Sequence, residues 1–348
     1  MRRLPIYFLI DISESMVGNP IEQVQEGMRT IIQNLRTDPY ALETVFVGII
    51  AFAGKAITLS PLTELYKFYP PTFPIGGGTS LSTGLDALMR EIDCSVQKTT
   101  LEKKGDWKPI VFLFTDGNPT DDCSAAFRRW NDRYRRHANL VAISLGDNVN
   151  TLTLAQITEN VLMLKDTTPE SFKQFFKWIS DSIKASSISV TDLGNDELKL
   201  PSTEGINLEK VNPAKHSNPD ENFVVLHGRC QTTHGDYLVK YARKTDFLGV
   251  ELPSRYNELG FRLVGAYPIN GAKYAQLSAG EEASVNTTKL TGVPACPCCG
   301  NQLGVVVCEC GKIFCVGESG DHACPWCGLE GTLGDIAPGG IDISRGLG

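Results

Sequence analysis

The sequence lacks several features that would assign it to common classes of protein. No apolar run approaches the ~20 residues that a membrane-spanning helix requires, and Asp11 interrupts the apolar stretch 6–10 too early for a secretory leader. The 33 Lys and Arg residues are outnumbered by 40 Asp and Glu, which gives a net charge of −7. Such a surface repels a phosphate backbone. We therefore expect a cytoplasmic protein with neither a membrane nor a nucleic-acid partner.

Motifs of common catalytic sites are also missing. The chain has no phosphate-binding loop of the GxxxxGK[ST] form and no GxSxG nucleophile elbow. The first of its five histidines is His137, so a catalytic triad built around Ser13 would have no nearby base. These absences predict a protein that is not an enzyme.

The first 188 residues alternate apolar runs with helical patterns, in a chain of 348 residues that is long enough for two or three domains. We expect strands at 5–10, 45–52, 56–61, 110–114, 140–145 and 161–164, and helices near 21–35, 80–89, 127–134 and 169–184. Strands that are apolar on both faces, with helices between them, are typical of a parallel sheet covered on two sides. The pattern therefore predicts an α/β domain over residues 1–188.

The pattern changes after this domain. Residues 189–221 are rich in Asn, Asp, Pro and Ser and predict a linker. Residues 222–292 predict a β-rich part with strands at 223–227, 237–242 and 261–266, and no helix of convincing period. The cysteine-rich segment 293–332 follows, and the Gly-rich residues 333–348 predict a flexible tail.

Oxygen-bearing side chains follow three of the expected elements. Asp11, Ser13 and Ser15 come directly after the first strand, Thr79 follows three glycines before the second helix, and Asp116 follows the strand 110–114. Ligands of open α/β sheets bind beyond the carboxyl ends of the strands. Each segment alone can be a helix cap or a turn, but together two carboxylates and three hydroxyls suit Mg²⁺. We predict a magnesium site formed by these five residues.

The motif Asp-x-Ser-x-Ser, the later Thr79 and Thr115-Asp116-Gly117 resemble the metal-ion-dependent adhesion site of the von Willebrand factor A family. The resemblance implies a Rossmann-like domain that holds one divalent ion and leaves a coordination position for an Asp or Glu of a partner protein. An alternative keeps the metal and adds chemistry, as a metal-dependent phosphohydrolase that uses Asp11 and Asp116. Ser13 stands where a haloacid-dehalogenase-type phosphatase carries a second Asp, which argues against this alternative.

Eight of the eleven cysteines lie between residues 296 and 327, and without an export signal such a cluster favours metal over disulfides. Cys296-Pro-Cys-Cys299-Gly and Cys324-Pro-Trp-Cys327-Gly share the pattern of a knuckle that directs two thiolates at one ion. The short strands 305–307 and 312–316 predict the hairpin of a zinc ribbon. Eight ligands predict two closed structural Zn²⁺ sites: Cys296, Cys299, Cys308, Cys310, Cys315, His322, Cys324 and Cys327.

The pairing of these ligands stays open at this point. We favour the pairing of the two knuckles on one ion, which leaves Cys308, Cys310, Cys315 and His322 for the second ion. Sequential pairing would instead put Cys308 and Cys310 on one ion with the first knuckle. A [4Fe–4S] site would need four Cys and no His, and a cross-brace fits the 308–310 spacing poorly. Cys298 is the surplus thiol, and Cys230, after an apolar strand, predicts a core thiol.

The order of these parts resembles the bacterial TerY-type proteins, which are associated with tellurite resistance. The resemblance rests on the adhesion-site motif, on Leu226-His227-Gly228-Arg229-Cys230 and Tyr237-Leu238-Val239-Lys240-Tyr241, and on the Cys/His cluster. It implies a C-terminal metal-binding domain with seven Cys and one His. It also implies a non-catalytic scaffold of a stress-response system, working beside a Ser/Thr protein kinase and a PP2C-type phosphatase. A zinc-ribbon nucleic-acid binder is disfavoured by the net charge.

Overall fold

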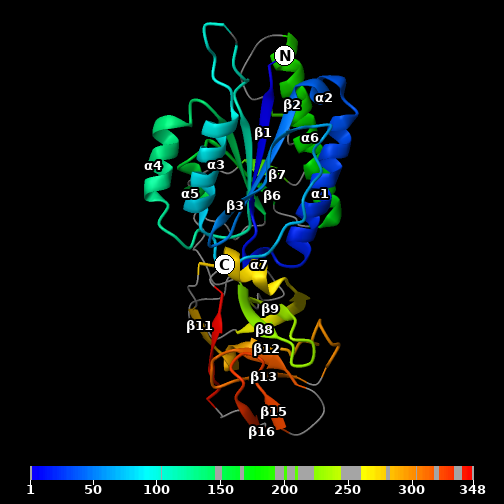
Figure 1. The fold of residues 1–348 in the computed structure, drawn as a ribbon, viewed down its shortest axis with the longest axis vertical. Coiled ribbons are helices and arrows are strands. Elements are labelled where there is room, and N and C mark those ends of the chain that lie inside the picture. Colours follow the sequence, from blue (N-terminus) through cyan, green and yellow to red (C-terminus); the bar gives the residue numbers. More distant parts are fainter. Residues whose placement is uncertain are drawn as a thin grey trace. The chain divides into compact units, whose positions relative to one another are not determined.

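A computed structural model describes residues 2–102, 104–145, 151–164, 168–192, 200–201, 208–210, 223–243, 260–279, 283–302, 304–316, 321–332 and 339–346 (Figure 1). The chain divides into two compact units. One contains residues 1–12, 19–73 and 79–219, and the other contains 13–18, 74–78 and 220–348. Each unit has its own main sheet.

The first unit is built on a seven-stranded sheet in the order β3-β2-β1-β4-β5-β6-β7. The pairs β1–β2, β1–β4, β4–β5 and β5–β6 are parallel, whereas the edge strands β3 and β7 are antiparallel to their neighbours. The strands are β1 (Leu4–Asp11), β2 (Val45–Phe52), β3 (Ala56–Glu64), β4 (Ile110–Thr115), β5 (Asn139–Leu145), β6 (Asn160–Leu164) and β7 (Leu208–Lys210).

Helices cover both faces of this sheet (Figure 1). One layer holds α1 (Asn19–Arg36), α2 (Pro39–Thr44) and α6 (Pro169–Asp192), and the other holds α3 (Leu81–Ser95), α4 (Ser124–Arg133) and α5 (Thr151–Ala155). Among the described helices, none combines the length and the apolar character that crossing a membrane would require.

Packing on both faces explains why the central strands are apolar throughout. All eight residues of β1 are buried, because successive side chains point to opposite helical layers. On one face Phe8 stacks on Phe112, with ring centroids 5.7 Å apart. On the same face α6 packs against α1 so closely that a Cβ on Gly27 would lie 1.9 Å from a ring carbon of Phe176.

The predicted α/β architecture with a mostly parallel sheet is confirmed, with element ends that differ by a few residues. Four features were not predicted. The short helices α2 and α5 have no counterpart among the expected helices. Helix α6 continues to Asp192, and β7 lies within the expected linker 189–221, where it pairs with β6 at the sheet edge. A three-residue strand carries too little alternation to be recognised from sequence. Most of the expected linker lies outside the described residues.

The second unit is β-rich, as predicted, and its main sheet has the order β12-β10-β9-β8-β14-β13. Two ribbons, β11–β17 and β15–β16, accompany it. The strands are β8 (Phe223–Arg229), β9 (Asp236–Arg243), β10 (Phe261–Pro268), β11 (Ala283–Asn286), β12 (Leu290–Thr291), β13 (Val305–Val307), β14 (Ile313–Cys315), β15 (Asp321–Ala323), β16 (Glu330–Thr332) and β17 (Asp342–Arg345).

The expected hairpin near residue 310 is present, because β13 and β14 pair antiparallel. It is not a separate module, since β14 also pairs parallel with β8 and so joins the hairpin to the main sheet. A helix, α7 (Gly271–Leu277), and the strand β17 within the expected tail were not predicted. The other residues of the expected tail before 339 lie outside the described residues.

Candidate metal centres

Asp11 and Thr115 end neighbouring parallel strands of the first unit. The register pairs Ile10 with Phe114, so the next residue of each strand also lies side by side. The Thr115 hydroxyl donates a 2.7 Å hydrogen bond to Oδ2 of the buried Asp11 carboxylate. Asp116 follows and is also buried. Asp11 and Asp116 therefore both follow the carboxyl ends of central strands, at the same edge of the sheet.

Thr79 is held in place by its backbone alone. Its N–H donates to the Thr120 hydroxyl at 3.0 Å, and its carbonyl accepts from the Thr120 N–H at 2.8 Å. The next residue, Ser80, donates its N–H to the carbonyl of Ala53, directly after β2. The Thr79 hydroxyl oxygen is buried and makes no hydrogen bond to any residue that the structure describes. A buried hydroxyl costs free energy unless it is satisfied, so this oxygen suits a ligand from outside the chain.

Ser13 directly precedes the short 3-10 turn that follows β1 (Glu14–Met16), and Ser15 lies within it. Both side chains are buried, and their hydroxyl oxygens are 3.0 Å apart. The Met16 N–H closes the turn on the Ser13 carbonyl at 3.0 Å. The two-residue spacing thus presents two hydroxyls together directly after Asp11.

In the second unit, cysteine sulfurs gather in two sets of four. In each set the four sulfur atoms lie within 4.8 Å of one another, and among the described residues no cysteine forms a disulfide. We call them the first and the second cysteine set. The first is Cys230, Cys296, Cys299 and Cys315; the second is Cys308, Cys310, Cys324 and Cys327.

The spacing of the sulfurs matches one tetrahedral ion in each set. A Zn–S bond of about 2.3 Å places two thiolate ligands about 3.8 Å apart. The separations are 3.8 Å for Cys299–Cys315, 3.6 Å for Cys308–Cys327 and 3.9 Å for Cys310–Cys324. An iron–sulfur cluster instead carries its four thiolates on different irons, which separates the sulfurs further. The geometry therefore fits a single ion and not a [4Fe–4S] cluster.

Three turns of one shape supply five of the eight sulfurs, those of Cys230, Cys296, Cys299, Cys324 and Cys327. In the turn of Cys296, its N–H donates to the carbonyl five residues on, and its carbonyl accepts from the N–H four residues on. Cys324 and Cys230 form the same two bonds. The residue after the second ligand position has positive φ in all three turns: it is Gly300, Gly328 and His234, with φ of 77°, 75° and 55°.

The ionisation of the thiols differs within each set. Burial raises the pKa of Cys230, but hydrogen bonds from Thr233 and from the Thr232 backbone outweigh it and lower the pKa to about 6. Burial raises the pKa of Cys308 to about 12 and also raises the pKa of Cys315. Four neighbouring thiolates repel one another, whereas a bound dication stabilises all four and releases their protons. The donor sets therefore fit soft-ligand divalent ions.

The pairing of the ligands differs from the sequence-based prediction. Neither knuckle with knuckle nor the sequential alternative is found, because the Cys296 knuckle joins Cys230 and Cys315 and the Cys324 knuckle joins Cys308 and Cys310. The two sets interleave along the chain, in the manner of a cross-brace. The pairing of β14 with β8 determines which cysteines join the Cys296 knuckle. The spacing of the cysteines along the chain does not reveal this strand pairing.

His322 and Cys230 exchange their expected roles. His322 lies outside both sets, with its Nδ1 at 3.1 Å from the side-chain nitrogen of Gln231. Cys230, expected to be a core thiol, belongs to the first set. Its turn lacks the second cysteine of a knuckle, because Thr233 stands in that place and donates its N–H to the Cys230 sulfur at 3.4 Å. The sequence contained one sign of this exchange. The well-spaced cysteines of the cluster are odd in number, so two sites of four ligands need either the histidine or one more cysteine from elsewhere in the chain.

Comparisons with known proteins give low sequence identity over part of the chain. Inter-alpha-trypsin inhibitor heavy chain H1 of Bos taurus is 28% identical over 119 residues, which are 33% of this chain and 13% of that protein. The Sus scrofa protein of the same name is 26% identical over 150 residues, 41% of this chain and 16% of that protein. The chain thus matches less than a fifth of the length of these curated relatives. Proximal thread matrix protein 1 of the mussel byssus is 17% identical, with a TM-score of 0.40 over 52% of this chain and 48% of that structure.

Family models match both units and leave only a short segment between them. Residues 6–178 match the von Willebrand factor type A domain, and residues 220–348 match the TerY-C metal binding domain. The first match contains Asp11, Thr79 and Asp116, and the second contains both cysteine sets. The chain therefore has the TerY-type architecture, a von Willebrand factor type A domain followed by a TerY-C metal-binding domain.

Proposed function

We propose that this chain is a non-catalytic scaffold that binds an acidic side chain of a partner protein through a divalent ion. The combination of the two domains supports a metal-dependent interaction scaffold. In our proposal the ion is Mg²⁺, and its ligands are Asp11, Ser13, Ser15, Thr79 and Asp116. Oxygen ligands of this kind are those that Mg²⁺ prefers.

The observation that carries the proposal is the Thr79 hydroxyl. It is buried, its backbone is fixed on both sides, and no described residue hydrogen-bonds to it. A ligand to a metal ion would satisfy this oxygen. With only two carboxylates among its protein ligands, the ion keeps positive character and attracts a third carboxylate. A partner's Asp or Glu is the group that fits.

We assign Zn²⁺ to each cysteine set. Four thiolates close the coordination sphere, so neither ion would have an open position for substrate. Their role is then structural: the ions would hold short strands and turns together in a unit whose described strands β13 to β16 have three residues each.

We further propose a bacterial stress-response setting in the cytoplasm, associated with tellurite resistance, with a Ser/Thr protein kinase and a PP2C-type phosphatase as partners. This finer proposal rests on the TerY-type architecture.

The test separates the two metals. Zinc-loaded wild type, Asp11→Ala and Thr79→Val are immobilised in magnesium-free buffer and exposed to host lysate with or without MgCl₂, with no chelator that would strip zinc. We expect the kinase or phosphatase to be captured by wild type with magnesium, and by neither variant. Equal capture by all three proteins would move the interface away from Asp11 and Thr79. Zinc content measured on the same samples confirms that the second unit is intact.

A further inference from the structure

The first unit contains a cavity of about 730 Å³ at the edge of the sheet opposite Asp11. Arg2 lines it just before β1, and Lys108 and Pro109 line it just before β4. The end of α3 and the segment 133–137 after α4 complete the wall. Ligand pockets commonly have volumes of about 300–1,000 Å³, so this cavity is large enough for a small molecule or a side chain.

The cavity is positively charged although the whole chain is acidic. Its lining includes five permanent cations, Arg2, Lys98, Lys108, Arg133 and Arg136, together with His137. Among the described residues, no ion pair involves Lys98, Lys108, Arg133 or Arg136. A concave wall of one charge concentrates the field and attracts a counter-ion. Here the counter-ion would be an anion.

The two acidic residues of the lining are already engaged. Asp106 accepts two hydrogen bonds from the Arg3 guanidinium, at 2.8 and 2.5 Å, and a third from the Gln97 N–H at 2.7 Å. Asp93 accepts from the Tyr134 hydroxyl at 2.5 Å. The charge of Asp106 is therefore balanced by Arg3. The Tyr134 hydroxyl brings no charge, so Asp93 offsets at most one of the five cations and the lining keeps a positive excess.

One wall of the cavity is preorganised. The Arg2 guanidinium lies 3.5 Å from the centre of the Trp107 ring, and its Nε donates to the Gly105 carbonyl at 2.7 Å. Stacking and hydrogen bonding fix the orientation of the guanidinium before any ligand arrives. A charge held in this way loses little side-chain entropy on binding.

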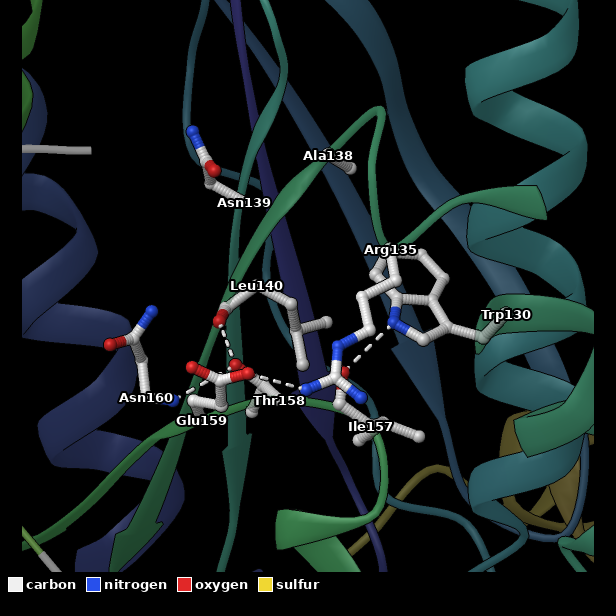
Figure 2. A pocket seen from close by; sticks show the side chains of 9 residues that line it. All are labelled: Trp130, Arg135, Ala138, Asn139, Leu140, Ile157, Thr158, Glu159 and Asn160. Carbon is white, nitrogen blue, oxygen red and sulfur yellow. Dashed lines mark hydrogen bonds and ion pairs between the residues drawn. The ribbon is translucent and has the colours of Figure 1, made fainter. Parts of the chain in front are cut away.

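A smaller cavity of about 150 Å³ in the same unit shows the contrast (Figure 2). Its one cation, Arg135, pairs with Glu159 at 2.8 Å. Thr158 donates to the Leu140 carbonyl, and the Trp130 indole donates to the Ile157 carbonyl at 3.0 Å. These polar groups are hydrogen-bonded or ion-paired within the chain. The smaller cavity therefore does not need a ligand to balance its charge.

Helix polarity alone does not explain the cations of the larger cavity. Arg133 and Arg136 lie near the carboxyl end of α4, where positive charge stabilises the helix dipole. Lys98 and Lys108 belong to no helix, and they line the same space. Cations at the end of a helix and cations outside any helix thus line the same cavity.

We propose that this cavity binds the phosphoryl group of a phosphate monoester. Such a group carries about −1.5 to −2 charges at pH 7, which matches several cations without ion pairs better than a single carboxylate does. Guanidinium forks and ammonium groups both pair with phosphate oxygens. The remaining volume accommodates the group that carries the phosphate, which is either a small metabolite or a phosphorylated side chain.

Calorimetric titration of the full-length, zinc-loaded protein tests the proposal. The probes are inorganic phosphate, an N-acetyl-phosphoserine amide and AMP, with citrate as a carboxylate control. We expect the phosphate monoesters to bind, and Arg133→Gln and Lys98→Gln each to weaken them about tenfold, as loss of one charged hydrogen bond would. The ratio between the phosphoserine derivative and AMP identifies the kind of carrier.

Arg128→Gln is the matched control, because Arg128 is an exposed residue of α4 that does not line the cavity. It should bind as wild type does. The proposal is wrong if no phosphate probe binds, if citrate binds as tightly as the monoesters, or if Arg128→Gln weakens binding as much as Arg133→Gln. Asp11→Ala should retain phosphate binding, which separates this cavity from the proposed adhesion site.

Discussion

The sulfur atoms of Cys230 and Cys315 lie 3.7 Å apart although 85 residues separate them in the chain. Strands β8 and β14 run parallel, and their last pair joins Arg229 with Phe314. Each cysteine is the next residue after this pair. Sheet pairing, and not sequence proximity, therefore assembles the first cysteine set.

Replacing Cys230 by Ser should remove one metal ion from the protein. Three thiolates and a hydroxyl bind Zn²⁺ far more weakly than four thiolates, because the hydroxyl stays protonated near pH 7. We expect mass spectrometry of metal content to show one zinc per chain instead of two. Cys298→Ser is the control: its sulfur lies outside both sets, 3.7 Å from the Gly235 carbonyl, and two zinc ions should remain. Two ions in Cys230→Ser would contradict the first set.

His322→Asn should leave the zinc content at two ions per chain. The ring contacts Gln231 and is no member of either cysteine set. The sequence-based ligand set of seven Cys and one His requires the opposite outcome, the loss of one ion. The pair Cys230→Ser and His322→Asn therefore discriminates between the two ligand sets in a single measurement.

Thr79→Val should abolish the effect of magnesium without weakening the apo fold. The removed hydroxyl has no hydrogen-bond partner among the described residues, so its loss should change the free energy of unfolding by less than about 1 kcal/mol. A ligand that binds only the native state raises the melting temperature. We expect MgCl₂ to raise the melting temperature of wild type and not of the variant. A magnesium response in Thr79→Val equal to that of wild type would exclude this residue as a ligand.

His234→Gly should stabilise the second unit by about 1 kcal/mol, since a residue with a Cβ pays a steric penalty at positive φ. His234 has a φ of 55° at the position that Gly300 and Gly328 occupy in the other two turns. Gly300→Ala is the opposite experiment and should destabilise the unit by a similar amount. Thermal unfolding at fixed zinc concentration measures both. A lower melting temperature for His234→Gly would mean that the imidazole has a stabilising role.

Gly27→Ala should destabilise the first unit, against the usual preference of helices for alanine. The new Cβ would overlap the Phe176 ring, and overpacking of this kind costs about 1–3 kcal/mol. Glu26→Ala, at the exposed neighbouring position, should stay within about 0.5 kcal/mol of wild type. Urea denaturation separates the two variants. Equal stabilities would show that α6 can move away from α1.

The first unit could be predicted from the sequence because its signals are local. Strand β1 is apolar throughout, and α1 buries Val24, Met28, Ile31, Ile32 and Leu35 on one face at helical spacing. Such patterns report burial directly. Helix α7 gave no such signal, since only Tyr274 and Leu277 of its seven residues are buried. Its one local sign was Asn270, whose side chain accepts the Lys273 N–H at 3.0 Å.

The cysteine sets show where local reasoning ends. The spacing of Cys296 with Cys299, and of Cys324 with Cys327, identified two knuckles correctly as pairs. Which other cysteines complete each set depends on the register of β8 against β14, and that register is a long-range property. Cys230 had no nearby cysteine to reveal it.

The interleaving of the two cysteine sets also constrains when the domain can fold. Cys230 leaves the ribosome 85 residues before Cys315, and the first set cannot close until the second of these has been synthesised. By then Cys308 and Cys310, which lie between Cys299 and Cys315, have emerged as well, and only Cys324 and Cys327 are missing from the second set. Closing so long a loop carries an entropic cost that local turns avoid. We therefore expect metal loading to be a late step of biosynthesis, so that the supply of the ion at that moment would decide whether the finished chain acquires its second folded unit.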